Sequence, residues 1–205
     1  MKRLMQVLGL LLFTAGSFAQ ETSPEQLVQK ITNEVLESIK SDKQLAAGDK
    51  QKAVKLAEEK VLPYIDFEEA TRLAVGRAWA KATPEQKKKL VSEFRNMLVR
   101  TYSNAIGGYE GQTLKVLPSR GKQDPQDTTV RTQFVRQGAP PLPIDFQMRK
   151  TDNTWKVYDI NVEGISLVLT YRSEFDAIVK QQGIDGLLKR LAQKNTPAAI
   201  GGTAK

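Results

Sequence analysis

The chain has 205 residues, a formal net charge of +8 at pH 7, and neither histidine nor cysteine. Without histidine it cannot build a Ser-His-Asp triad or a histidine-ligated zinc site, and without cysteine it has no disulfide or thiolate site. Only carboxylate, lysine or tyrosine chemistry remains, so we expect a protein that is not an enzyme and that uses no cofactor or metal.

The excess of positive charge favours an anionic partner. Nucleic acid is not the expected one, because acidic residues are interspersed with the basic ones and no aromatic residues follow a basic stripe. A chain of this length is expected to form one domain, or one domain with a lobe, and to bury a sizeable apolar core.

Residues 1–19 have the three parts of a secretory signal peptide. Lys2 and Arg3 form the positive start, a charge-free apolar run covers residues 7–16, and Ser17 and Ala19 are the small residues of a cleavage site. The run is too short to span a bilayer, which takes about 20 residues. We therefore expect cleavage after Ala19 and a mature protein outside the cytoplasm; an uncleaved amphipathic helix is the alternative.

The N-terminal half of the mature chain carries repeated helix-start signals. Residues 23–26 form a capping box with proline at the first helical position. Asp49 is a candidate N-cap for a second helix that ends at Pro63, and Asp66 is one for a third helix that Gly76 interrupts. The first helix has one apolar stripe, at Leu27, Ile31, Val35 and Ile39.

Another capping box, at residues 83–86, opens the strongest predicted helix of the chain. Gly107 and Gly108 are expected to end it. Its apolar face comprises Leu90, Phe94, Met97, Leu98, Tyr102 and Ile106. Together these signals predict a helical N-terminal half.

From residue 112 the apolar pattern changes from helical spacing to alternation. Ile144, Phe146 and Met148 alternate with polar residues, which is typical of a strand with one face in the core. The predicted strands are 112–118, 128–137, 143–150 and 154–162. Because short turn-rich links join them, we predict a four-stranded antiparallel twisted sheet with helical cover on one face.

Helix is predicted to return after Gly164, with breaks at Gly183 and Gly186. Residues 196–205 consist mostly of small residues and are expected to form a flexible tail. The fold class is therefore α+β, with a helical N-terminal half, the antiparallel sheet, and C-terminal helices.

These patterns alone leave the function open. Apolar helix faces opposite an apolar sheet face describe a packed core and a hollow equally well. The chain contains none of the glycine-rich phosphate-binding, nucleophile-elbow or zinc-protease motifs.

Several stretches, taken together and in this order, resemble the MlaC family, also called the toluene-tolerance or ABC-transporter auxiliary family. They are PYIDF at 63–67, LAVGRAW at 73–79, TPEQ at 83–86, WKVYDINVEGISL at 155–167 and YRSEF at 171–175. The resemblance runs from about Glu25 to Leu191, and we assign residues 20–195 to one MlaC-like domain.

The resemblance implies a phospholipid-binding carrier in the periplasm of Gram-negative bacteria. Such a carrier moves glycerophospholipid between an outer-membrane lipoprotein–porin complex and an inner-membrane ABC transporter with an MCE-domain ring, and so maintains outer-membrane lipid asymmetry. It also implies an apolar cavity between sheet and helices, which holds the acyl tails of the cargo and leaves the headgroup outside. A monomer is the expected state for a shuttle.

Under this resemblance, the acyl tails should contact side chains that face the space between sheet and helices; an ordinary core contact is the alternative for each. Arg77, Arg100 and Arg172 interrupt apolar faces and are candidates to meet the lipid phosphate at the rim. A solvated or carboxylate-paired arginine is the alternative there. The candidate lipid-binding residues are Phe94, Leu98, Tyr102, Val130, Phe134, Ile144, Phe146, Met148, Val168, Tyr171 and Phe175.

Two other functions stay open at this point. An adaptor or chaperone-like protein would show the same patterns with a filled core. A carboxylate enzyme would need paired acids in a polar cleft, and Asp145 and Asp159, on adjacent predicted strands, are the nearest candidates.

Overall fold

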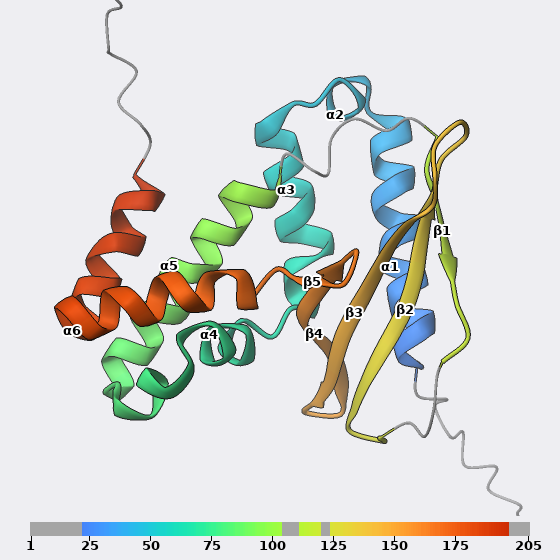
Figure 1. Ribbon diagram of the computed structural model, residues 1–205. Coiled ribbons are helices and arrows are strands. Elements are labelled where there is room, and N and C mark those ends of the chain that lie inside the picture. Colours follow the sequence, from blue (N-terminus) through green and yellow to red (C-terminus); the bar gives the residue numbers. More distant parts are fainter. Residues whose placement is uncertain (1–21, 104–110, 120–123, 197–205) are drawn as a thin grey trace, which may run out of the picture.

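The computed structural model describes residues 22–103, 111–119 and 124–196. The predicted signal peptide, the helix stop at Gly107 and Gly108, and all of the predicted tail except Thr196 lie outside these residues. Figure 1 shows an antiparallel sheet with one helix against it and a group of helices beside it. No helix within the described ranges is long and apolar enough to cross a membrane.

Helices make up the described chain before the sheet. They are α1 (Pro24–Ser41), α2 (Lys43–Ala46), α3 (Lys50–Lys60), the 3-10 turn η1 (Leu62–Tyr64), α4 (Phe67–Val75), the 3-10 helix η2 (Gly76–Lys81) and α5 (Pro84–Tyr102). The short α2 is not predicted from the sequence; the other α-helices are.

The predicted helix starts are confirmed, because each depends on a side chain close in sequence. Ser23 and Thr83 each form a capping box with the glutamine three residues later. The carboxylates of Asp49 and Asp66 accept hydrogen bonds from backbone N–H groups in the first turns of α3 and α4. Gly76 ends α4 in a conformation with positive φ.

The strands follow one another across the sheet in chain order, and all neighbours are antiparallel. The turn between β3 and β4 is one of the short turn-rich links expected from the sequence: Asp152 and Asn153 both have positive φ, as a type I′ turn requires. The strands are β1 (Thr113–Val116), β2 (Asp127–Val135), β3 (Leu142–Thr151), β4 (Thr154–Val162) and β5 (Ile165–Ser166).

Within the described residues the sheet has five strands, so the prediction of four was wrong. Glu163 and Gly164 have φ values of 52° and 83° and form a second tight turn. This turn pairs Val162 with Ile165 and adds β5 at the edge of the sheet. A strand of two residues is too short to show alternation, which is why the sequence pattern does not reveal it.

The last helix also begins later than predicted. A 3-10 turn, η4 (Leu169–Tyr171), precedes α6 (Arg172–Asn195). The predicted break in this region is confirmed at Gly183, whose φ of 70° and ψ of −174° interrupt the helix. Gly186 follows the kink, and a Cβ there would collide with the side chain of Gln182.

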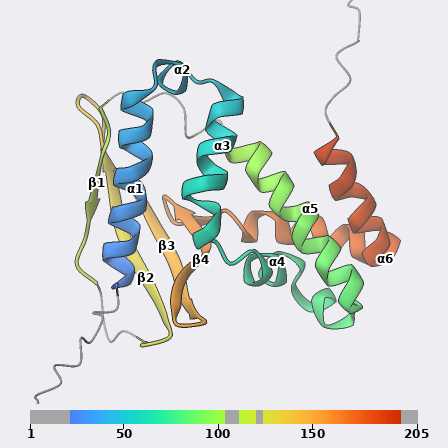
Figure 2. The ribbon, with the colours of Figure 1, turned by 180° about the vertical axis from the view of Figure 1, so that it is seen from behind.

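One face of the sheet packs against α1, which lies in front of the strands in Figure 2. Leu27 and Val28 of α1 join Val130, Met148 and Val157 in a buried apolar cluster, which we call the sheet core. The opposite face of β2 and β3 carries mainly polar side chains. This is the usual arrangement of an antiparallel sheet that is covered on one side.

Helices α4, α5 and α6 pack against one another beside the sheet and form the helical lobe (Figure 1). Its core contains Ala70, Ala74, Val75, Ala82, Leu90, Phe94, Met97, Val168, Phe175, Leu187 and Leu191. Among the described residues, none belongs to both this core and the sheet core. The two parts of the molecule therefore bury their apolar side chains in separate clusters.

Polar contacts at the start of α4 join the sheet to the helical lobe. The backbone N–H of Asp66 donates to the carbonyl oxygen of Val157 in β4, at 2.8 Å. Arg149 of β3 donates from Nε to the Asp66 carboxylate and from Nη1 to the Glu69 carboxylate, both at 2.8 Å. Asp66 and Glu69 are buried, so Arg149 compensates two carboxylates that have lost most of their contact with water.

These hydrogen bonds keep both carboxylates ionised. Burial opposes the ionisation of Asp66, but the backbone N–H of Glu69 and the Arg149 guanidinium outweigh it and lower the pKa. The pKa of Glu69 is lowered first by its hydrogen bond from Arg72; burial opposes this, and the charge of Arg149 supports it.

Replacing Arg149 by glutamine is expected to lower the free energy of unfolding by about 2 kcal/mol, because it removes charged hydrogen bonds to two buried carboxylates. Urea denaturation at neutral pH, followed by circular dichroism, measures this loss. Arg131→Gln is the matched control, since Arg131 lies on the polar face of β2 and pairs with no carboxylate among the described residues. Equal losses in the two variants would contradict the role given to Arg149.

Acid should weaken the junction between sheet and lobe. Asp66 and Glu69 bind protons less readily in the folded chain than in the unfolded chain, since their folded-state pKa values are lowered. The stability they contribute is therefore complete above about pH 5, where unfolded carboxyls are ionised, and is lost as the pH falls through the folded pKa values. Urea midpoints measured across this range should fall more steeply for the wild type than for Glu69→Gln. Parallel curves would show that Glu69 carries no such linkage.

Candidate functional site

Three aromatic rings lie at the centre of the helical lobe. Phe94 of α5 meets Tyr171 and Phe175 edge to face, with ring centroids 5.4 Å apart in both pairs. Tyr171 and Phe175 stack with centroids 5.7 Å apart. Leu98 and Val168 pack into the same core. Five of the residues proposed to bind lipid are thus brought together within the lobe.

Tyr102, the last residue of α5, gives this aromatic group a polar edge. Its hydroxyl lies 3.4 Å from the hydroxyl of Tyr171. Burial raises the pKa of Tyr171, and the hydrogen bond with Tyr102 raises it further, so Tyr171 stays neutral throughout the physiological range. Both side chains are only half-buried.

The remaining candidates lie on the face of the sheet that α1 partly covers. Val130, Phe146 and Met148 belong to, or pack against, the sheet core, and Phe146 is the cross-strand partner of Val130. Phe134 and Ile144 lie on the same face, nearer the turn between β2 and β3. Both are half-buried and belong to neither core.

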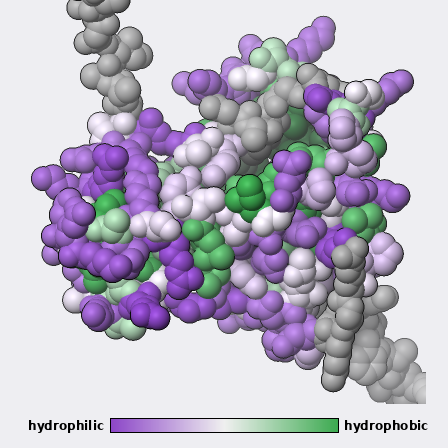
Figure 3. All heavy atoms as spheres, in the orientation of Figure 1, coloured by the Kyte–Doolittle hydropathy of each residue, from purple (hydrophilic) through white to green (hydrophobic). Residues whose placement is uncertain are grey.

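Side chains on this face of the sheet become more exposed along β3, from Met148 toward Leu142. Met148 is fully buried, Ile144 is half-buried, and Leu142 at the start of the strand is 37% exposed. Ile165, at the edge of the same sheet, is 61% exposed. Figure 3 shows hydrophobic side chains gathered in the middle of the molecule, between the helical lobe and the sheet. The described residues thus leave part of an apolar face without full cover.

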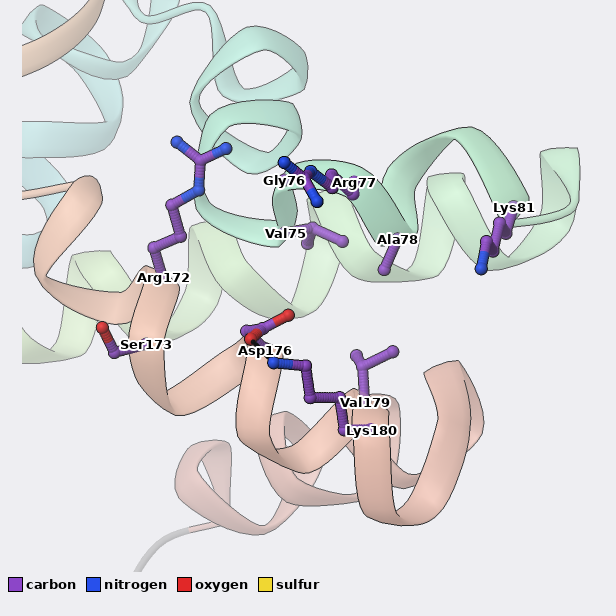
Figure 4. Close-up of a pocket in the computed structure, with 10 residues that line it drawn as sticks. All are labelled: Val75, Gly76, Arg77, Ala78, Lys81, Arg172, Ser173, Asp176, Val179 and Lys180. Atoms are coloured by element: carbon purple, nitrogen blue, oxygen red, sulfur yellow. Dashed lines mark ion pairs between the residues drawn. The ribbon is translucent and has the colours of Figure 1, made fainter.

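A second feature is a hollow of about 630 Å³ between η2 and the first half of α6. Figure 4 shows Arg77, Lys81, Arg172 and Lys180 around it, with the carboxylate of Asp176 close to Lys180. Asp176 and Lys180 form an ion pair at 2.6 Å. The hollow therefore carries a surplus of positive charge.

Gly76 shapes this hollow. A Cβ at this position would lie 3.1 Å from Nε of Arg172, so the guanidinium packs directly over the glycine backbone. Gly76 also ends α4, and the negative end of that helix dipole favours a cation there.

The three arginines proposed for the rim do not stay together. Arg77 and Arg172 line the same hollow although they are far apart in sequence. Arg100 instead donates a hydrogen bond to the backbone carbonyl of Asn195 at the end of α6.

The carboxylates considered for an enzyme are not cross-strand partners. Asp145 pairs with Asn161, and Asp159 pairs with Gln147. The Asp159 carboxylate accepts hydrogen bonds from the backbone N–H of Val168 and the hydroxyl of Ser166. These contacts fasten the segment after β5, which is a structural role. No cluster of three or more acidic residues suited to a metal ion occurs in the part of the chain that the structure describes.

A family model described as MlaC protein matches residues 29–193. The chain belongs to the MlaC family. The match spans both the sheet and the helical lobe, and it confirms the resemblance seen in the sequence.

Named relatives and a solved structure agree with this assignment. The intermembrane phospholipid transport system binding protein MlaC of Haemophilus influenzae is 25% identical over 197 residues, 95% of this chain and 92% of that protein. The toluene tolerance protein ttg2D of Pseudomonas putida is 24% identical over 164 residues, 80% of this chain and 76% of that protein. A phospholipid-binding protein from Ralstonia solanacearum, solved in complex with a phospholipid, is 35% identical with a TM-score of 0.76 and covers 83% of this chain and 96% of that chain.

Some residues of the cationic hollow and some exposed apolar residues could not be identified from the sequence. Lys81 and Lys180 complete the hollow, but an exposed lysine beside a helix has no pattern that separates it from a solvated one. Ile165 and Leu169 are exposed apolar residues within a stretch that reads as the buried start of a helix. Only the fold shows that they face outward.

Replacing one buried and one half-buried candidate by alanine should distinguish a core residue from a residue on the partly covered surface. Phe94→Ala is expected to cost about 4 kcal/mol of unfolding free energy, because it leaves a cavity in the lobe. Ile144→Ala should cost only about 1 kcal/mol, because the side chain already touches solvent. Chemical denaturation of both variants gives the comparison, and equal costs would place Ile144 in a filled core.

Proposed function

We propose that this protein is a periplasmic phospholipid carrier that shuttles glycerophospholipid between outer-membrane and inner-membrane complexes. The observation that carries the proposal is membership of the MlaC family, together with 35% identity to a protein solved with a phospholipid bound. The proposal includes removal of residues 1–19 on export, a folded unit at residues 20–195 and a monomeric shuttle. Its partners are an inner-membrane ABC transporter with an MCE-domain ring and an outer-membrane lipoprotein–porin complex.

The acyl tails are proposed to lie in an apolar cavity between the sheet and the helices. Half-buried Phe134 and Ile144 on the sheet, and Tyr102 and Tyr171 at the edge of the lobe, are the candidates best placed to line it. The fully buried candidates would support these side chains from behind. They are Phe94, Val130, Met148, Val168 and Phe175. Leu98 and Phe146, which are partly buried, complete the proposed set.

Free energy explains why a carrier needs such a cavity. Two acyl chains hold about 30 methylene groups, and exposing them to water would cost about 25 kcal/mol. A dry apolar cavity removes most of that cost, so exchange with a membrane complex becomes nearly balanced. Tail binding needs shape and exclusion of water more than directed hydrogen bonds, which agrees with a chain that lacks polar active-site motifs.

The headgroup is proposed to stay outside the cavity, where Arg77 and Arg172, which line the cationic hollow, supply positive charge. Arg100 is the third proposed rim residue, although it already bonds to Asn195. In this arrangement the cargo is ligand rather than substrate, and the protein acts without catalysis or cofactor.

Native mass spectrometry of the purified protein tests the proposal. The wild type should carry a mass adduct that organic extraction releases as phospholipid. Ile144→Trp, which adds apolar bulk to the partly covered face, should lose most of the adduct and keep its melting temperature.

The matched control is Gln133→Trp, which places the same ring on the opposite face of the neighbouring strand and should keep the adduct. Wild-type protein free of lipid would refute the carrier function and favour an adaptor with a filled core. Equal lipid loss in both tryptophan variants would refute the location of the cavity.

A further inference from the structure

The hollow between η2 and α6 has more positive charge than a single phosphodiester can neutralise. Lys180 is paired with Asp176, but Arg77, Lys81 and Arg172 form no ion pair within the described residues. All three side chains are exposed. A phosphodiester carries one negative charge, so one headgroup would leave two of these cations uncompensated. A concave surface with charge of one sign also concentrates its field on an oncoming anion.

Exposed apolar side chains lie beside this charge. Leu169 is 43% exposed and Ile165 is 61% exposed. Leu169 begins the 3-10 turn η4, in which residues three apart lie on the same side, and Arg172 is three residues later. Leu169 therefore lies next to a residue of the cationic hollow, and Ile165 belongs to β5, which contacts η4.

We propose that Ile165, Leu169 and the cationic hollow form one docking surface for an acidic segment of a protein partner that also presents an aliphatic side chain. The acidic residues would enter the hollow and meet Arg77, Lys81 and Arg172. The aliphatic residue would cover Ile165 and Leu169. This inference rests on the proposed function only because a carrier must dock before it exchanges cargo.

Shape and composition favour a protein over a membrane as the occupant. A flat bilayer does not enter a hollow, whereas a protein loop or helix end does. The exposed large apolar residues of the described chain are aliphatic, at Leu142, Ile165 and Leu169. Surfaces that insert into membranes typically add Trp or Phe to such residues.

A fluorescein-labelled peptide of repeated Glu-Glu-Leu units is the probe, and fluorescence anisotropy with the full-length protein is the measurement. Binding should weaken as salt rises, since the contact is between exposed charges. The combined variant Arg77→Gln, Lys81→Gln and Arg172→Gln should bind the peptide about tenfold more weakly. Ile165→Ser with Leu169→Ser should weaken it several-fold at unchanged salt dependence.

The control combines Lys30→Gln, Lys43→Gln and Lys50→Gln, three exposed lysines on α1, α2 and α3. It removes the same net charge at a distance from the hollow and should keep the peptide affinity. An equal loss in the control would overturn the proposal, because attraction would then follow net charge alone. So would peptide binding that the Ile165 and Leu169 changes leave untouched.

Two further arms distinguish other ligands. If inorganic phosphate displaces the peptide completely at the same ionic strength as an ineffective chloride control, the hollow is a simple anion site. If phosphatidylglycerol vesicles bind through these residues and the peptide does not, the surface is a membrane contact. Either result would overturn the proposal. Native mass spectra of the same wild-type samples report bound lipid independently. Failure of the carrier function and failure of the proposed docking surface can therefore be distinguished.

Discussion

The contact between Arg149 and the buried carboxylates of Asp66 and Glu69 determines how the two parts of the molecule fit together. Each part keeps its own apolar core, and the junction between them is built from charge and backbone hydrogen bonds. An apolar junction would have used up the side chains that a hydrocarbon ligand needs. The polar junction holds sheet and lobe in place while Phe134, Ile144 and Tyr102 remain only half-buried.

Because the two cores are separate, the molecule presents two kinds of surface, one apolar and one cationic. Apolar residues that stay only half-buried, such as Phe134, Ile144 and Tyr102, suit acyl chains, for which fit and exclusion of water matter most. The cations around η2 and the start of α6 suit charged groups that stay in water. Tyr171 and Arg172 are adjacent in sequence, and one packs into the aromatic group while the other faces the hollow. Relatives of this chain are named for phospholipid transport and phospholipid binding, which agrees with this amphipathic arrangement.

Features set by neighbours in sequence could be predicted, whereas features set by distant contacts could not. The helix caps at Ser23, Asp49, Asp66 and Thr83 follow from side chains within three residues, and all are confirmed. The strand β5 could not be predicted, because two residues are too few to show alternation of apolar and polar side chains. The meeting of Arg77 with Arg172 depends on how α6 returns across η2, which no local pattern encodes. Apolar alternation identified the inward face of β3 but not how far α1 covers it, since core and cavity use the same residue types.

The glycine at position 76 has a consequence for protein engineering. Glycine-to-alanine exchange is a common route to thermostability. It lowers the conformational entropy of the unfolded chain and so stabilises the folded protein by about 0.4–1 kcal/mol. At φ +63° the exchange would instead strain the backbone, and the new methyl group would press on the Arg172 guanidinium. A variant with alanine at position 76 would therefore change the shape of the cationic hollow. Position 76 should be excluded from libraries designed to raise stability.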